Sequence, residues 1–201
     1  MAAKQKNATG LDRREVVAAL LADRGDALVV TGLGSPTYDA YAAGDHDLNF
    51  YLWGAMGGAA MVGLGLALAQ PKRRVLVITG DGEMLMGLGS LATIAVEAPK
   101  NLAIAVIDNG HYGETGMQPA HTGRGVDITG MAKAAGFRSA TTVRTASGLK
   151  QWLAVFHRKP GPVFGDIKVS AAPAPMALPV RDGTAIKHRF RSALLGVQGL
   201  E

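Results

Sequence analysis

The distribution of apolar and polar positions along the chain predicts alternating strands and helices. Three short runs, 27–31, 74–79 and 102–107, are apolar without the alternation of a strand that has one solvent-exposed face, so they predict buried strands. Further strands are expected at 47–52, 139–143 and 162–169. Helical spacing or composition predicts helices at 12–24, 54–69, 85–97, 127–135 and 146–158.

Strands that alternate with helices are typical of an α/β fold. Gly80-Asp81-Gly82 is expected to form a turn between the strand at 74–79 and the helix at 85–97, and the strand at 102–107 completes a βαβ unit. We therefore predict a three-layer fold, in which helices cover both faces of an open parallel sheet. The connection at 109–126 has no periodic pattern, and long connections of that kind in compact domains are usually functional.

The chain is divided by composition into one domain and two end segments. Residues 1–11 are predicted to be an N-terminal tail, residues 12–170 the domain, and residues 171–201 a Pro-rich linker followed by a helix at Thr184–Leu195. That helix is basic and amphipathic, and it is expected to dock either on its own domain or on a partner. Its apolar face comprises Ile186, Phe190, Leu194 and Leu195.

Composition narrows the classes of function. The 201 residues include no cysteine, which excludes disulfides and thiol chemistry and fits a cytoplasmic protein. No signal peptide is expected at the start, and the apolar stretch 54–69 is shorter than the roughly 20 residues of a membrane span. The net charge is +5, but the basic residues, Arg13 and Arg14 among them, gather near the termini and predict a solvated face rather than binding to nucleic acid.

Polar residues that follow two of the predicted strands form a candidate metal site. Asp81, between Gly80 and Gly82, comes directly after one strand, and Asn109 comes after the next. Ligands of open parallel sheets bind at the carboxyl ends of the strands, where these residues are expected to meet. A carboxylate and an amide oxygen suit Mg²⁺, and the glycines allow a phosphate to approach the backbone.

A third strand end provides a second candidate phosphate loop, at Gly32, Gly34 and Ser35. The pattern Gly32-x-Gly34-x-x-Thr37 after a strand also resembles a dinucleotide fingerprint, but it ends in Thr, and Pro36 would open the turn differently. A nicotinamide-binding oxidoreductase therefore remains a minor alternative.

Taken together, these motifs resemble the cofactor site of thiamine diphosphate (ThDP) enzymes. Gly-Asp-Gly followed by Asn after an apolar strand is the family's metal and diphosphate signature, and 52–57 resembles its segment around the aminopyrimidine ring. The resemblance implies that Met56 wedges the cofactor into a V shape and that the Gly54 carbonyl accepts a hydrogen bond from its amino group. It further implies that Asp81, Asn109 and the His111 carbonyl bind Mg²⁺. The cofactor contacts it implies are Gly32, Gly34, Ser35, Gly54, Met56, Gly80, Gly82, Glu83, Tyr112 and Gly113.

Within the ThDP enzymes, residues 12–195 resemble the phosphonopyruvate and sulfopyruvate decarboxylases. The resemblance is carried by 47–57, 107–111 and 115–119. The chain departs from that pattern at Ala120, where Thr is expected, and at His46, where Arg is expected. Both positions lie on loops that are expected to face a small anionic 2-oxoacid substrate. His46, His111 and His121 are the candidates for proton transfer, and none is assigned a catalytic role.

The resemblance also implies a missing catalytic group. ThDP decarboxylases use a glutamate from a second α/β domain to activate the cofactor, and 201 residues leave no room for that domain. The chain is therefore expected to be the β subunit of a heteromer, such as a dimer of heterodimers or a larger assembly, whose α subunit donates the glutamate. The implied reaction converts a 3-sulfo- or 3-phosphono-pyruvate-like substrate to an aldehyde and CO₂.

Two further alternatives stay open. The first alternative to the decarboxylase is the ThDP-binding subunit of an acetolactate synthase-like enzyme, which joins carbon atoms instead of releasing an aldehyde. A regulatory module that binds ThDP without turnover would carry the same motifs.

Overall fold

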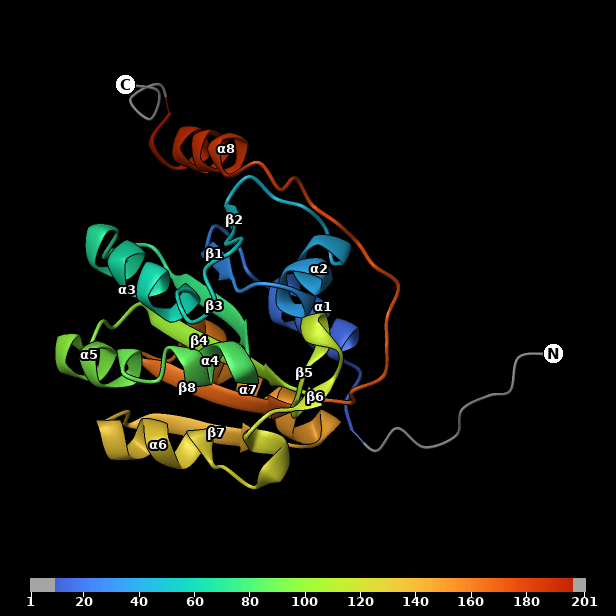
Figure 1. Ribbon diagram of the computed structural model, residues 1–201. Coiled ribbons are helices and arrows are strands. Elements are labelled where there is room, and N and C mark those ends of the chain that lie inside the picture. Colours follow the sequence, from blue (N-terminus) through green and yellow to red (C-terminus); the bar gives the residue numbers. More distant parts are fainter. Residues whose placement is uncertain (1–9, 197–201) are drawn as a thin grey trace.

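The computed structural model describes residues 10–196, which form a parallel sheet with helices on both faces (Figure 1). The six strands have the order β2-β1-β3-β4-β8-β7, and all five pairings between neighbours are parallel. This confirms the predicted α/β class. The strands are β1 (Leu28–Thr31), β2 (Asn49–Tyr51), β3 (Val75–Gly80), β4 (Leu102–Asp108), β7 (Ser139–Val143) and β8 (Val163–Lys168).

Each face of the sheet carries its own hydrophobic core. Successive side chains of a strand point to opposite faces, so Leu76 and Ile78 of β3 pack in one core while Val75 and Val77 pack in the other. The first core is covered by α1 (Arg13–Ala22), α2 (Ser35–Ala42) and α7 (Ala146–Arg158). The second is covered by α3 (Ala59–Ala69), α4 (Asp81–Met86), α5 (Ser90–Glu97) and α6 (Ile128–Ala135).

Helix α2 was not predicted from the sequence. The glycines at 32 and 34 and Pro36 indicated a loop, but Pro36 lies in the first turn of the helix, where its missing N–H costs nothing. Gly34 is the N-cap residue, with φ of 78°, and no side chain caps the helix. The backbone at the start of α2 is therefore left available to a ligand.

Two predicted helices have different bounds in the structure. The helix expected at 54–69 begins only at Ala59, and the one expected at 85–97 is divided into α4 and α5. Both differences lie where Gly57 and Gly87 pack against each other. The two backbones are so close that a Cβ on Gly87 would lie 2.2 Å from the Gly57 oxygen. The expected turn at Gly80-Asp81-Gly82 is also wrong in detail, since Asp81 is already the first residue of α4.

The long connection after β4 contains short elements that fold over the carboxyl end of the sheet. Strand β5 (His111–Tyr112) pairs antiparallel with β6 (Gln118–Pro119), and 3₁₀ turns occupy Gly113–Thr115 (η1) and Thr122–Arg124 (η2). Ala120, buried at 0% exposure, donates its N–H to the Gly110 oxygen at 2.7 Å. The connection is thus folded back onto the end of β4.

The C-terminal helix α8 (Gly183–Leu195) docks on its own domain, at the edge strand β2 (Figure 1). Phe190 packs edge-on against Phe50, with ring centroids 5.6 Å apart, and Arg189 forms an ion pair with Asp45 at 2.6 Å. Leu195, which the sequence placed on the apolar face, is 42% exposed. The linker before α8 is held where Trp53 Nε1 donates to the Val180 oxygen at 3.1 Å.

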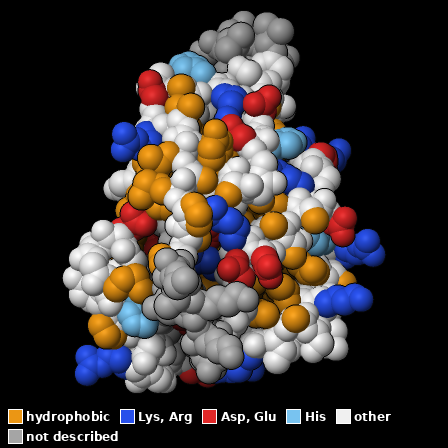
Figure 2. All heavy atoms as spheres, turned by 90° about the vertical axis from the view of Figure 1, so that its right-hand side faces the viewer, with side chains coloured by type: hydrophobic (Ala, Val, Ile, Leu, Met, Phe, Trp, Pro, Cys, Tyr) orange, Lys and Arg blue, Asp and Glu red, His pale blue; other side chains and the backbone are white. Residues whose placement is uncertain are grey.

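Charged side chains are mixed with apolar ones on the face seen in Figure 2, toward which the strands of Figure 1 point. The expectation that Arg13 belongs to a solvated basic face is wrong, because Arg13 is only 9% exposed. Among residues 10–196, no helix has both the length and the apolar character that a membrane crossing requires. Most of the predicted tail at 1–11 lies outside the described residues.

Candidate cofactor site

The carboxyl ends of β1, β3 and β4 meet at one edge of the sheet. β3 lies on the side of β1 opposite to β2, so the direction in which strands are added reverses between β1 and β3, and ligands of open α/β sheets bind at such a point. A cavity of about 330 Å³ opens there. It is lined by Arg13, Leu33, Ser35, Pro36, Met56, Gly80, Asp81, Gly82, Glu83, Met86, Ile107, Asn109, His111, Tyr112, Gly113, Glu114 and Thr115.

The structure brings most of the predicted site residues to this cavity. Asp81 and Asn109, the two expected metal ligands with side-chain oxygens, line it together with His111. So do seven of the ten expected cofactor contacts: Ser35, Met56, Gly80, Gly82, Glu83, Tyr112 and Gly113. Gly32, Gly34 and Gly54 are not among the lining residues, although each lies within two residues of one that is.

The other two histidine candidates do not line the cavity. His46 precedes β2 and thus lies toward the amino ends of the parallel strands, where its Nδ1 accepts a hydrogen bond from the Leu48 N–H at 3.0 Å. Burial, with the nearby Arg24 charge, lowers the pKa of His46. His121 is exposed at the start of η2. Of the three, only His111 lines the cavity.

Asp81 is a buried carboxylate that lacks enough positive partners. It is 2% exposed, and its Oδ2 accepts a hydrogen bond from the Thr122 hydroxyl at 2.5 Å. Burial, followed by repulsion from Asp108, raises the pKa of Asp81 to about 6. A divalent cation beside this carboxylate would offset both effects, so the donor chemistry fits Mg²⁺.

Asn109 is fixed by the residue two positions further on. Its Oδ1 accepts the His111 backbone N–H at 2.9 Å, and its carbonyl oxygen lies 2.8 Å from Nδ1 of the His111 ring. These contacts hold the amide at the end of β4, next to the end of β3, which Asp81 directly follows. No group of three or more His, Cys, Asp or Glu residues that could hold a metal exists within residues 10–196, so a cation here would depend on one carboxylate, an amide and backbone oxygens.

Glu83 joins α4 to the loop after β1. The side chain is 3% exposed, its Oε2 accepts from the Thr79 hydroxyl at 2.8 Å, and its Oε1 has no hydrogen-bond partner among the described residues. A Cβ on Gly32 would lie 1.6 Å from Oε2, so a side chain there would displace the Glu83 carboxylate. Burial raises the pKa of Glu83, although the Thr79 hydrogen bond opposes that effect.

Two side-chain contacts shape the part of the cavity wall that the connection after β4 forms. The Tyr112 ring packs directly on Gly82, where a Cβ would lie 2.3 Å from a ring carbon. Glu114 covers Gly34 in the same way and accepts a hydrogen bond from the Tyr38 hydroxyl at 3.0 Å. Gly82 and Gly34 therefore allow these side chains to pack closely, in addition to leaving room for a phosphate.

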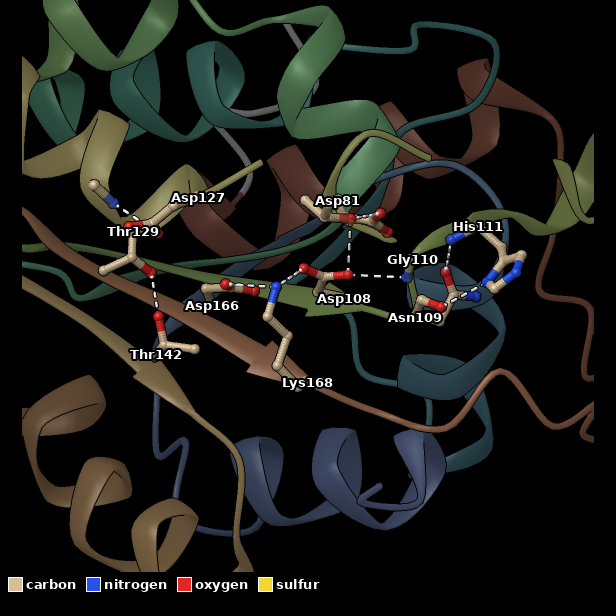
Figure 3. Close-up of polar contacts among 12 residues, drawn as sticks. Asp81, Asp108, Asn109, Gly110, His111, Asp127, Thr129, Thr142, Asp166 and Lys168 are labelled. Carbon is tan, nitrogen blue, oxygen red and sulfur yellow. Dashed lines mark hydrogen bonds and ion pairs between the residues drawn. The ribbon is translucent and has the colours of Figure 1, made fainter. Parts of the chain in front are cut away.

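Sequence reasoning missed a charged cluster next to the candidate metal ligand Asp81, shown in Figure 3. Lys168 of β8 contacts both Asp108 and Asp166, the latter at 2.9 Å. Burial and the Asp108 charge raise the pKa of Asp166 to about 7 despite Lys168. Burial acts against the charge on Lys168, but hydrogen bonds to the two carboxylates outweigh it and raise the pKa of Lys168. The available signal was Asp166 itself, an acid within a strand whose neighbours are apolar.

Comparisons with known proteins place these motifs in a family. The family "Thiamine pyrophosphate enzyme, C-terminal TPP binding domain" matches residues 34–167. A putative thiamin diphosphate-dependent enzyme from Mycobacterium smegmatis has a similar fold, with a TM-score of 0.71 and 22% identity over 81% of this chain and 32% of that one. At this level of identity the likeness concerns the fold alone.

Curated relatives are closer in sequence. Sulfopyruvate decarboxylase subunit beta of Methanothermobacter thermautotrophicus is 37% identical over 188 residues, which cover 92% of this chain and 97% of the relative. Sulfopyruvate decarboxylase of Methanosarcina acetivorans is 41% identical over 68% of this chain but only 35% of its own length. Phosphonopyruvate decarboxylase of Streptomyces viridochromogenes is 43% identical over 69% of this chain and 34% of its own length.

The chain thus spans about a third of two of these relatives and nearly all of the third. The resemblance noted in the sequence is confirmed by both the domain match and the coverage of the beta subunit. The chain belongs to the thiamine diphosphate-dependent sulfopyruvate and phosphonopyruvate decarboxylase family, as a protein with the C-terminal, cofactor-binding domain.

Proposed function

We propose that this chain is the β subunit of a two-chain 2-oxoacid decarboxylase that depends on ThDP and Mg²⁺. The observation that carries the proposal is the meeting of Asp81 and Asn109 at adjacent strand ends, in a cavity that Met56 also lines. Membership of the family supports ThDP as the cofactor. The near-complete match to a beta subunit supports assembly with an α subunit.

When bound, ThDP supplies a nucleophilic carbon and an electron sink for decarboxylation. This chain would hold it at both ends. Asp81, Asn109 and the His111 carbonyl would bind Mg²⁺ at the diphosphate, while Met56 would support the folded rings and the Gly54 carbonyl would orient the amino group. The remaining contacts we propose are with the backbone and side chains of Gly32, Gly34, Ser35, Gly80, Gly82, Glu83, Tyr112 and Gly113.

The acids in the cavity support the need for a partner. Asp81 is assigned to the cation, Glu83 is held by Thr79 below the loop after β1, and Glu114 is held by Tyr38. We assign none of the three to activation of the ring that Met56 would support. Met56 and Met86 are 41% and 59% exposed beside the cavity, where an α subunit carrying the missing glutamate would cover them.

The relatives' names favour decarboxylation of a 3-sulfo- or 3-phosphono-pyruvate-like substrate to an aldehyde and CO₂. Carbon–carbon ligation of the acetolactate synthase type is the alternative within ThDP enzymes. The two reactions differ in product, so incubation of the assembled complex with sulfopyruvate, phosphonopyruvate and pyruvate, followed by aldehyde and acetolactate assays, distinguishes them.

The binding part of the proposal is tested by calorimetry on the complex with its α subunit. ThDP should bind the wild-type complex only when Mg²⁺ is present, and Asp81→Ala should weaken that binding by about a hundredfold or more, because the cation loses its charged ligand. Glu97→Ala, which removes an exposed acid at the end of α5, serves as the control and should leave the affinity unchanged. Unaltered ThDP affinity in Asp81→Ala would refute the proposed site.

A further inference from the structure

The cavity has an unbalanced set of charges. Three acidic side chains line it, Asp81, Glu83 and Glu114, whereas Arg13 is the only lysine or arginine among the lining residues that the structure describes. A diphosphate brought into this cavity adds several negative charges, and one Mg²⁺ neutralises only part of them. Among the described residues that line the cavity, Arg13 is therefore the lysine or arginine available to the ligand.

Arg13 is buried and held in place by one strong contact. It begins α1 and is 9% exposed, and its NH1 donates to Oδ2 of Asp39 at 2.6 Å. Asp39, in α2, is 0% exposed. No other hydrogen bond of the Arg13 side chain is found within residues 10–196, so further guanidinium N–H groups remain for a ligand.

The ion pair between Arg13 and Asp39 does not neutralise the local charge. Arg14 also contacts Asp39, through Nε at 3.1 Å from Oδ1. Two guanidinium groups thus share one carboxylate, which leaves a net charge of +1 on these three residues. Burial raises the pKa of Asp39, while both arginines act to lower it and to keep it charged. Because Asp39 is shared between two arginines, Arg13 keeps positive charge and hydrogen-bond donors for an anionic ligand in the cavity.

The same ion pair connects Arg13 to the loop that starts α2. Asp39 lies in α2, an eight-residue helix whose N-cap is Gly34 and whose start has no side-chain cap. Ser35, the first residue of that helix, lines the cavity with Arg13. A guanidinium, a hydroxyl and uncapped backbone N–H groups are therefore presented together, which is the donor set that phosphate oxygens require.

We propose that Arg13 binds the diphosphate of ThDP directly and that Asp39 is the residue that positions it. The inference rests on the proposed function, since it assumes ThDP as the ligand. A substrate sulfonate or phosphonate offers similar oxygens, but Arg13 lines the cavity together with Ser35, one of the proposed diphosphate contacts. Arg13 is therefore assigned to the diphosphate, and the experiment below includes a readout for the substrate.

The experiment measures ThDP affinity of the complex with its α subunit, at saturating Mg²⁺ and without substrate. Arg13→Met should weaken ThDP binding by about ten- to a hundredfold, the range expected when a charge-assisted hydrogen bond to phosphate is lost. Arg13→Lys keeps the charge but not the planar guanidinium group, so its ThDP affinity should lie between those of the wild type and Arg13→Met. Thiamine, which has no phosphate, should bind wild type and Arg13→Met equally.

Arg14→Met is the matched control, because Arg14 shares Asp39 but does not line the cavity. It should leave ThDP affinity within about twofold. Asp39→Asn should weaken ThDP binding less than Arg13→Met does. Thermal denaturation of each variant without ligand identifies any general loss of folding, and Arg13→Lys provides the answer if Arg13→Met does not fold.

The outcomes separate the two proposals. If the wild-type complex fails to bind ThDP, the proposed function is wrong. If it binds ThDP but folded Arg13→Met and Arg13→Lys bind it equally well, the assignment of Arg13 is wrong while the proposed function stands. A raised KM for the 2-oxoacid with unchanged ThDP affinity would assign Arg13 to the substrate and would also overturn the inference.

Discussion

The Thr122 hydroxyl lies 2.5 Å from Oδ2 of Asp81 and 3.0 Å from Oδ1 of Asp108. A hydroxyl carries one hydrogen, so it can donate to only one of the two carboxylates at a time. The two carboxylates compete for this hydrogen, although Oδ1 of Asp108 also accepts the Gly110 N–H at 2.9 Å, and the repulsion between them is part of the reason that the pKa of Asp81 is raised. Thr122 therefore connects the proposed metal ligand to the cluster of Asp108, Lys168 and Asp166.

Removal of that hydroxyl should weaken cation binding. In Thr122→Val, the carboxylate of Asp81 keeps its charge but loses the contact that fixes its orientation, and we expect the Mg²⁺ concentration for half-maximal ThDP binding to rise by about five- to tenfold. Thr122→Ser keeps the hydroxyl and should behave like the wild type. Equal Mg²⁺ dependence in Thr122→Val and Thr122→Ser would show that Thr122 does not position Asp81.

Gly82 should tolerate no side chain while Tyr112 keeps its place. The Cβ of Gly82→Ala would meet the Tyr112 ring at 2.3 Å, so the ring, which lines the cavity, must move and change the shape of the cavity. We expect ThDP affinity to fall by about tenfold, with a smaller effect on folding because Tyr112 is only half-buried. The double variant with Tyr112→Leu should recover part of the affinity in the same titration; no recovery would indicate that the clash is not the cause.

Asp166 should make the folded chain less stable as the pH rises. Its pKa is raised from 3.8 to about 7, so the folded chain holds a proton that the unfolded chain releases near pH 4. The contribution of this group to the free energy of unfolding is therefore greatest below pH 4 and is lost as the pH rises through 7. Urea denaturation should show that the free energy of unfolding of Asp166→Asn declines less than that of the wild type between about pH 4.5 and 7.5. A decline identical to that of the wild type would contradict the assignment.

Phe190 should determine whether α8 stays docked. Its ring is 4% exposed and packs on Phe50, so Phe190→Ala should lower the local stability of α8 by about 3 kcal/mol. This corresponds to amide exchange on the order of a hundredfold faster in α8, measured by mass spectrometry. ThDP affinity should not change, because α8 does not line the cavity. Unchanged exchange would mean that Arg189 and the linker hold the helix without Phe190.

The sequence predicted those parts of the site that depend on the ends of strands. Asp81 and Asn109 follow apolar runs, and a parallel sheet brings the ends of neighbouring strands together whatever the rest of the chain does. Arg13 and Thr122 could not be found in this way. Arg13 looks like any other basic residue near a terminus until Asp39 is known to lie beside it, and Thr122 reaches Asp81 only because the connection after β4 folds back. Both depend on contacts between distant parts of the chain, which periodicity does not report.

The close approach of Glu83 to Gly32 links two motifs that are far apart in the sequence. With 1.6 Å between Oε2 and a notional Cβ at position 32, a side chain there requires the Glu83 carboxylate to move or residue 83 to become shorter. In an alignment of related chains, the two positions should therefore change together, with glycine at 32 wherever glutamate stands at 83. Such paired variation would record the contact between the loop after β1 and the first turn of α4 in the history of the family.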